Sequence, residues 1–140
     1  MTEEGIFSQS QIKQIEEGRE AGLDVSVYAK KEFAAMHMRQ IRLGLLEGLA
    51  VERYATADYD WFQMEEIRLG MEEGVDIGCY ASPEIPYEKM RQIRKGLVAG
   101  VVLTPYLALE PGVLRQLRKA VVANVDIMDY IEAGYQAEQL

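Results

Sequence analysis

The sequence has little of what most enzymes and metalloproteins use for chemistry. Its 140 residues include one cysteine, one histidine and one tryptophan. Cys79 has no second cysteine with which to form an internal disulfide, and His37 has no second imidazole or thiolate with which to hold zinc. We therefore expect no metal site and no cofactor.

Long apolar runs are also missing. No apolar segment approaches the ~20 residues that cross a bilayer, and residues 1–5 are acidic, unlike a secretory signal or a transit peptide. With 49% hydrophobic residues, 27% charged residues and four prolines, the composition excludes a disordered or collagen-like chain. We expect a globular, cytoplasmic protein without a membrane partner.

What the sequence does have is internal repetition. Five tyrosines recur in steps of 26, 26, 26 and 24 residues: Tyr28, Tyr54, Tyr80, Tyr106 and Tyr130. A fixed period of this length is the signature of a repeat architecture. The period divides a single predicted domain, residues 1–140, into five copies at about 8–33, 34–59, 60–85, 86–110 and 111–135.

Two glycine positions in each copy predict the local backbone. The first position holds Gly18, Gly44, Gly70, Gly96 and then Ala120, whereas the second holds Gly22, Gly48, Gly74, Gly100 and then Asn124. Alanine replaces glycine where a small residue is needed inside a helix, and asparagine replaces it where a left-handed backbone is needed. The first position therefore predicts a close approach within a helix, and the second predicts the residue just after the helix end.

Each copy is predicted to contain a long helix of about three turns, since Met38, Ile41 and Leu45 follow helical spacing. The segment that follows is expected to be a second, short helix, although a strand is the alternative for Val25 to Tyr28. Expected start signals are Ser8 or Ser10, Asp60 and a first-turn Pro86 for long helices, and Asp24, Asp76, Asp126 and Thr104-Pro105 for short ones.

A unit this short cannot bury its apolar face alone, so the copies must stack on one another. The predicted fold class is therefore all-α: an α-solenoid of five helical hairpins, each with a long and a short helix. The recurrent tyrosine is expected to join copy to copy, with its hydroxyl group on a backbone atom or water.

No arrangement of residues suggests catalysis. The glycines belong to the repeat, and His37 and Cys79 have no partner with a nucleophile signature. Irregular aromatic residues form a predicted exposed loop between copies, and loop aromatics are typical of binding interfaces. This aromatic loop consists of Tyr59, Trp61 and Phe62.

Charge is distributed unevenly along the chain. Residues 1–88 carry 18 acidic and 8 basic side chains, whereas residues 89–119 carry one acidic and seven basic side chains. A predicted acidic face consists of Asp58, Asp60, Glu65, Glu66, Glu72, Glu73 and Asp76. A predicted basic patch consists of Arg91, Arg94, Lys95, Arg115, Arg118 and Lys119. The arginines either pair with carboxylates of neighbouring copies or bind an acidic ligand.

The unit at residues 64–77 reads MEEIRLGMEEGVDI and closes on Tyr80 and Ala81. It resembles a tandem helical repeat of about 26 residues in proteins of gut-dwelling Gram-positive bacteria, often linked with mobile elements. The resemblance covers nearly the whole chain and brings no activity and no site residues. The fourth copy departs from the pattern at Val102 and Pro105, and the fifth at Ala120 and Asn124.

These observations favour a non-enzymatic module that binds another protein. The first alternative is an acidic inhibitor that imitates nucleic acid toward a host nuclease or defence complex, and the second is an enzyme with an unrecognised site. Head-to-tail self-association between the basic and acidic regions is a further possibility. Direct binding of nucleic acid is not expected at an isoelectric point near 4.7.

Overall fold

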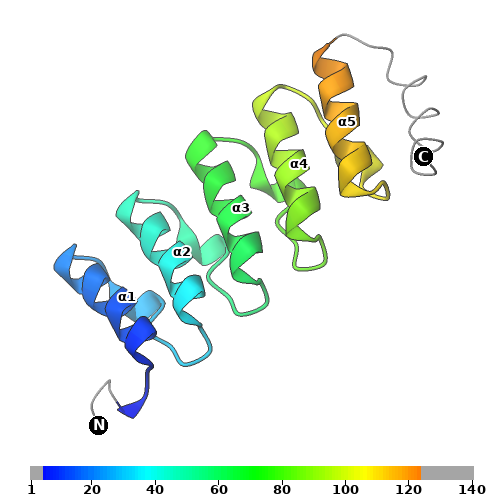
Figure 1. The fold of residues 1–140 in the computed structure, drawn as a ribbon. Helices are drawn as coiled ribbons and strands as arrows, with labels where there is room; N and C mark the ends of the chain where they lie inside the picture. Colours follow the sequence, from blue (N-terminus) through cyan, green and yellow to red (C-terminus); the bar gives the residue numbers. More distant parts are fainter. Residues whose placement is uncertain (1–4, 124–140) are drawn as a thin grey trace. The chain divides into compact units, whose positions relative to one another are not determined.

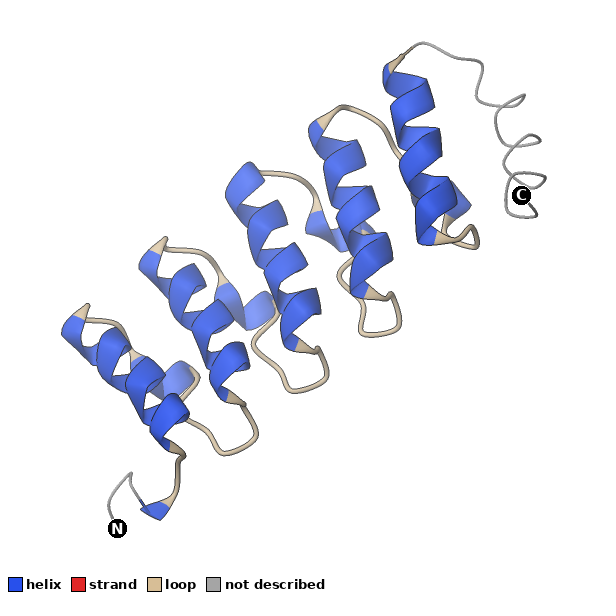
Figure 2. Cartoon of the chain, viewed as in Figure 1, coloured by secondary structure: helices blue, strands red, loops and turns tan. Residues whose placement is uncertain are grey.

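A computed structural model describes residues 5–123. Among these residues there are helices, turns and loops but no strand (Figure 2). In chain order the elements are α1 (Gln9–Glu20), η2 (Val25–Val27), α2 (Ala35–Leu46), η3 (Val51–Arg53), α3 (Trp61–Glu73), η4 (Ile77–Cys79), α4 (Tyr87–Val98), η5 (Thr104–Tyr106) and α5 (Pro111–Val122). The predicted all-α repeat fold of the α-solenoid class is confirmed, and the short elements are 3-10 helices rather than strands.

The chain divides into two compact units, Met1–Glu72 and Glu73–Leu140. In the first unit, α1 and α2 lie side by side, with η2 and η3 on one side of the long helices (Figure 1). In the second unit, α4 packs against α5. The prediction of a single domain stays a prediction, and Asn124, Asp126 and Tyr130 lie outside the described residues.

Side chains with oxygen atoms start two of the long helices, α1 and α3, whereas α2, α4 and α5 have no side-chain cap. Ser8 accepts a hydrogen bond from the backbone of Gln11, whose side chain accepts one from the backbone of Ser8. Asp60 and Gln63 form the same reciprocal pair at the start of α3. Pro86 is the residue that precedes α4 rather than its first-turn residue, because its backbone is still extended. The prediction of Pro86 as a first-turn residue is therefore wrong by one position.

The short helices start in two ways. Asp24 and Asp76 accept hydrogen bonds from the backbone two residues later, as predicted for helix-capping aspartates. In the fourth copy Leu103 precedes the short helix and Thr104 is its first residue, so Thr104 is not the cap. Val102 of this copy and Ala50 of the second copy stand where the first and third copies have the aspartate, so both of these copies lack the capping side chain.

The long helices end as the two glycine positions predict. Gly48 has a φ of 73°, and Gly22, Gly74 and Gly100 are similarly left-handed, whereas Gly44 and Gly70 lie within α2 and α3. The backbone N–H of Leu49 donates to the carbonyl oxygen of Gly44 at 2.9 Å. This bond is the one expected of a Schellman stop, and it ties the two glycine positions of one copy together.

Each early tyrosine binds the long helix of its own copy. The Tyr54 hydroxyl group donates to the carbonyl oxygen of Gln40 at 2.6 Å, and Tyr28 makes the same bond to Gln14. The prediction of a hydroxyl group on a backbone atom is confirmed. This hydrogen bond closes the turn between the long and the short helix of one copy, and the expectation that the tyrosine joins copy to copy stays a prediction.

The fourth copy packs differently. Gly96 faces the carbonyl oxygen of Val101 and the side chain of Leu103, whereas Gly44 faces the Tyr54 hydroxyl group. Leu103 is 1% exposed and Tyr106 is only half-buried. Leucine has therefore taken the place of the tyrosine ring, and Leu103 joins the apolar core of Val101, Leu109, Val113, Leu114 and Leu117.

Candidate protein-binding surface

Arginines at one repeat position connect neighbouring copies through hydrogen bonds to glutamine side chains. Arg42 Nε donates to Gln14 Oε1 at 2.9 Å, and Arg68 Nε donates to Gln40 Oε1 at 2.9 Å. In the second unit, Arg118 Nε donates to Gln92 Oε1 at 3.2 Å. Gln14 and Gln40 therefore serve two helical elements at once, because their backbone oxygens accept the tyrosine hydroxyl groups described above. We call these bonds the Gln–Arg ladder.

Carboxylates pair with arginines at the same repeat position. Arg42 pairs with Glu17 at 3.2 Å, Arg94 pairs with Glu73 at 2.7 Å, and Arg68 pairs with Glu72 one turn along α3. The alternative in which the arginines pair with carboxylates of neighbouring copies is thus confirmed for Arg42 and Arg94, whereas Arg68 pairs within its own copy. The hydrogen bonds and ion pairs of these guanidinium groups therefore help to hold neighbouring long helices together.

The predicted basic patch therefore divides into two groups. Arg94 is 8% exposed and Arg118 is half-buried on Gln92, so neither is a fully exposed residue of the predicted patch. Lys95, Arg115 and Lys119 are exposed. Arg91 is half-buried and lies over the Tyr87 ring, with its central carbon 5.5 Å from the ring centroid.

Each long helix has three positions that lie on an accessible face of that helix. They are spaced by four and then three residues, which places them on the same side of a helix, and none of their residues is buried. We call this the outer face: Lys13, Glu17, Glu20; Arg39, Leu43, Leu46; Glu65, Leu69, Glu72; Arg91, Lys95, Val98; Arg115, Lys119, Val122. Repeat comparison at the sequence level did not identify this face, because the positions share no residue type.

The predicted aromatic loop is only partly a surface feature. Tyr59 is 6% exposed, and burial raises the pKa of its phenol, so its prediction as an exposed residue is wrong. Trp61 and Phe62 open α3 rather than lying in a loop. Their rings stack with centroids 3.7 Å apart, and Phe62 is 39% exposed. This pair is the aromatic part of the surface.

The predicted acidic residues have separate roles. Glu66 is 1% exposed, so it is not part of an acidic surface. Asp60 and Asp76 cap α3 and η4, and Glu72 and Glu73 pair with arginines. Of this set, Asp58 is exposed and Glu65 is half-buried. Most of these carboxylates are therefore engaged in holding the local fold.

His37 has a structural role that the sequence did not reveal. It lies in the first turn of α2, where its Nε2 is 3.0 Å from the carbonyl oxygen of Tyr59. Gln11 donates to the carbonyl oxygen of Phe33 at the equivalent position of its own copy, and Lys89 donates to that of Leu107. This helix position therefore holds the following loop in each of these copies.

Cys79 is half-buried. Desolvation raises the pKa of its thiol, and the nearby Asp76 carboxylate raises it further. The thiolate form that reacts with electrophiles is therefore disfavoured at neutral pH.

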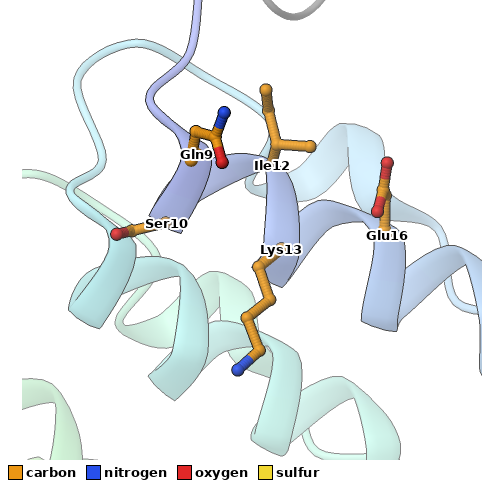
Figure 3. A pocket seen from close by; sticks show the side chains of 5 residues that line it. All are labelled: Gln9, Ser10, Ile12, Lys13 and Glu16. Carbon is orange, nitrogen blue, oxygen red and sulfur yellow. The ribbon is translucent and has the colours of Figure 1, made fainter.

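A shallow hollow of about 520 Å³ lies against α1 (Figure 3). Its lining consists of Gln9, Ser10, Ile12, Lys13 and Glu16. One helix supplies all of these residues, so no second element directs polar groups toward them. The hollow lacks the convergent groups that orient a small ligand.

Two further observations concern the described residues only. Within residues 5–123, no three His, Cys, Asp or Glu side chains are grouped so that they could hold a metal ion. No helix in that range combines the length and the apolar character that crossing a bilayer requires. Comparisons with family models, with curated proteins and with solved structures give no match for this chain.

Proposed function

We propose that the chain is a non-enzymatic interaction module that presents the outer face of its long helices to another protein. The observation that carries this proposal is the contrast between inward and outward positions of the repeat. Inward positions keep one chemistry from copy to copy, as in Met38, Met64 and Met90, each 0% exposed. A repeat scaffold with this property can change its surface without changing its fold.

The outward positions vary in both charge and polarity. The first of the three reads Lys, Arg, Glu, Arg and Arg along the five helices, and the last reads Glu, Leu, Glu, Val and Val. Leu46, Val98 and Val122 are each more than half exposed, so the face combines charges with apolar side chains. Mixed surfaces of this kind on rigid elements support specific protein binding.

The acidic-inhibitor alternative has less support. A nucleic-acid mimic needs carboxylates that are free to replace phosphates. Among the predicted acidic residues, Glu66 is buried and four others cap helices or pair with arginines.

Site-specific photocrosslinking in cells that express the chain natively tests the proposed function. A photoreactive amino acid replaces Leu46 or Lys119 on the outer face, or Ser26 or Glu52, which are exposed residues of the short helices. We expect discrete protein adducts from the outer positions and none from the short-helix positions. Adducts confined to the short-helix positions, or no protein adduct from any position, would contradict the proposal.

A further inference from the structure

The outer face of α4 and α5 concentrates one sign of charge. Arg91 and Lys95 are one helical turn apart on α4, and Arg115 and Lys119 are one turn apart on α5. The two helices pack against each other, and packed helices lie ~8–10 Å apart. The bond from Arg118 to Gln92 fixes their register, so that equivalent positions of the two helices are neighbours.

The fold does not require the three exposed cations of this group. Among the described residues, no carboxylate forms an ion pair with Lys95, Arg115 or Lys119. Like charges one turn apart on a helix destabilise it, and two such pairs lie side by side here. Arg94 pairs with Glu73 and Arg118 belongs to the Gln–Arg ladder, but neither explanation extends to their exposed neighbours.

Two valines border the cations. Val98 is 55% exposed and follows Lys95 by three residues, and Val122 is 57% exposed and follows Lys119 by three residues. The same order of cation, cation and valine therefore runs along both helices. We call these six residues the cationic face: Arg91, Lys95, Val98, Arg115, Lys119 and Val122.

We infer that the cationic face is the docking site for an acidic segment of another protein, one in which carboxylates are followed by an apolar residue. This inference rests on the proposed function and names its partner class. The carboxylates pair with the lysines and arginines, and the apolar side chain covers Val98 and Val122. Charge complementarity sets the orientation and the association rate, while burial of the valines slows dissociation.

A protein segment fits better than a polyanion. The whole chain has a net charge of −8, and residues 1–88 carry ten more acidic than basic side chains. At long range this excess repels DNA, RNA or an anionic membrane. Four cations and two valines, by contrast, match the size and mixed character of a short amphipathic peptide.

The inference can be tested by peptide display, in which random peptides are selected for binding to the immobilised full-length chain. A library of 16-residue peptides is selected, and the enriched peptides are measured by fluorescence anisotropy. We expect enrichment of Asp and Glu beside apolar residues. Binding should weaken at least tenfold in the double variant Lys95→Glu, Lys119→Glu and change less than twofold in Lys30→Glu, Lys31→Glu, which reverses two exposed lysines elsewhere.

Additional measurements check that the variants fold and identify the class of ligand. Thermal unfolding of both double variants should show intact folding, since all four lysines are exposed. The inference is overturned if no peptide is enriched, if the enriched peptides are not acidic, or if both variants bind them equally. It is also overturned if a dT16 oligonucleotide or vesicles containing phosphatidylserine bind more tightly than the peptides. Peptides that instead require Phe62 or Leu46 would overturn this inference and leave the proposed function standing.

Discussion

The hydroxyl oxygen of Tyr54 lies where the side chain of any residue larger than glycine at position 44 would begin. A Cβ atom on Gly44 would be 2.1 Å from this oxygen and 2.6 Å from Val51 Cγ1. Gly18 has the same relationship with Tyr28 and Val25 in the first copy. The helical glycine therefore leaves the space that the tyrosine hydroxyl group occupies in each of these copies.

We predict that Gly44→Ala lowers the free energy of unfolding by about 3 kcal/mol, even though alanine favours the helix itself. Adding Tyr54→Phe should recover part of the loss, because it removes the oxygen that clashes with the new Cβ atom. Urea unfolding of the two single variants and the double variant gives the coupling. Strictly additive losses would show that the tyrosine does not exclude the side chain.

Gly48→Ala provides the matched control, since a Cβ atom on Gly48 meets nothing within 4 Å. Its cost should come from the positive φ alone, about 1 kcal/mol. The same urea unfolding experiment compares the two sites. A loss at Gly48 as large as that at Gly44 would mean that backbone strain, rather than packing, explains both glycine positions.

The tyrosines predict sensitivity to alkali. Burial raises the pKa of the Tyr54 phenol well above its ordinary value of 10.0, so the folded state favours the protonated hydroxyl group. The stability that this group contributes is complete below pH 10 and is lost as the pH rises toward the raised pKa. Tyr54→Phe should cost about 1 kcal/mol at pH 7 through the lost bond to Gln40. Thermal unfolding above pH 10 should then show a smaller further loss than in the natural chain, and an equal loss would contradict this assignment.

Glu47 predicts an effect at acidic pH. A side-chain hydrogen bond with Glu72 raises the pKa of the Glu47 carboxyl above its ordinary value of 4.5. This carboxyl therefore contributes stability at low pH that is lost as the pH rises through the raised pKa. Glu47→Gln should raise the melting temperature at pH 7 and leave it nearly unchanged at pH 4. An equal shift at both pH values would show that the two carboxyl groups are not coupled.

The same substitution at two adjacent residues of α4 should have very different effects on stability. Arg94→Glu places a carboxylate opposite Glu73 at a buried position, so we expect a loss of about 3 kcal/mol or more in stability. Lys95→Glu changes an exposed residue and should change stability by less than about 0.5 kcal/mol. Circular dichroism melts compare the two variants. A stable Arg94→Glu variant would show that the Arg94–Glu73 ion pair does not hold this unit together.

The repeat made much of the fold predictable from the sequence. Substitutions within one chain separated the helical glycine from the left-handed glycine, because alanine and asparagine satisfy different backbone needs. The same comparison failed where a copy changes its packing, as when Leu103 replaces the Tyr106 ring over Gly96. That exchange depends on the three-dimensional space beside the glycine, which residue spacing does not contain.

The candidate surface was harder to predict, because charge alone does not distinguish a ladder residue from an exposed one. Arg94 and Lys95 are neighbours of similar charge, yet one is buried on Glu73 and the other is exposed. The direction of each side chain follows from its position around the helix. Whether a cation is buried depends on the carboxylate or amide that the preceding copy places beside it. Tyr59 and Glu66 were placed on the surface for the same reason, since their burial depends on contacts across copies.

The central claim is that a constant interior carries a variable outer face that binds another protein. A scan of all single substitutions across residues 5–123, with folded yield and binding of the photocrosslinked partner measured for each variant, tests it most directly. We predict that substitutions which reduce binding while preserving folded yield cluster at outer-face positions of the long helices. Clustering of those substitutions on the short helices, or around one set of polar residues outside the outer face, would contradict the claim.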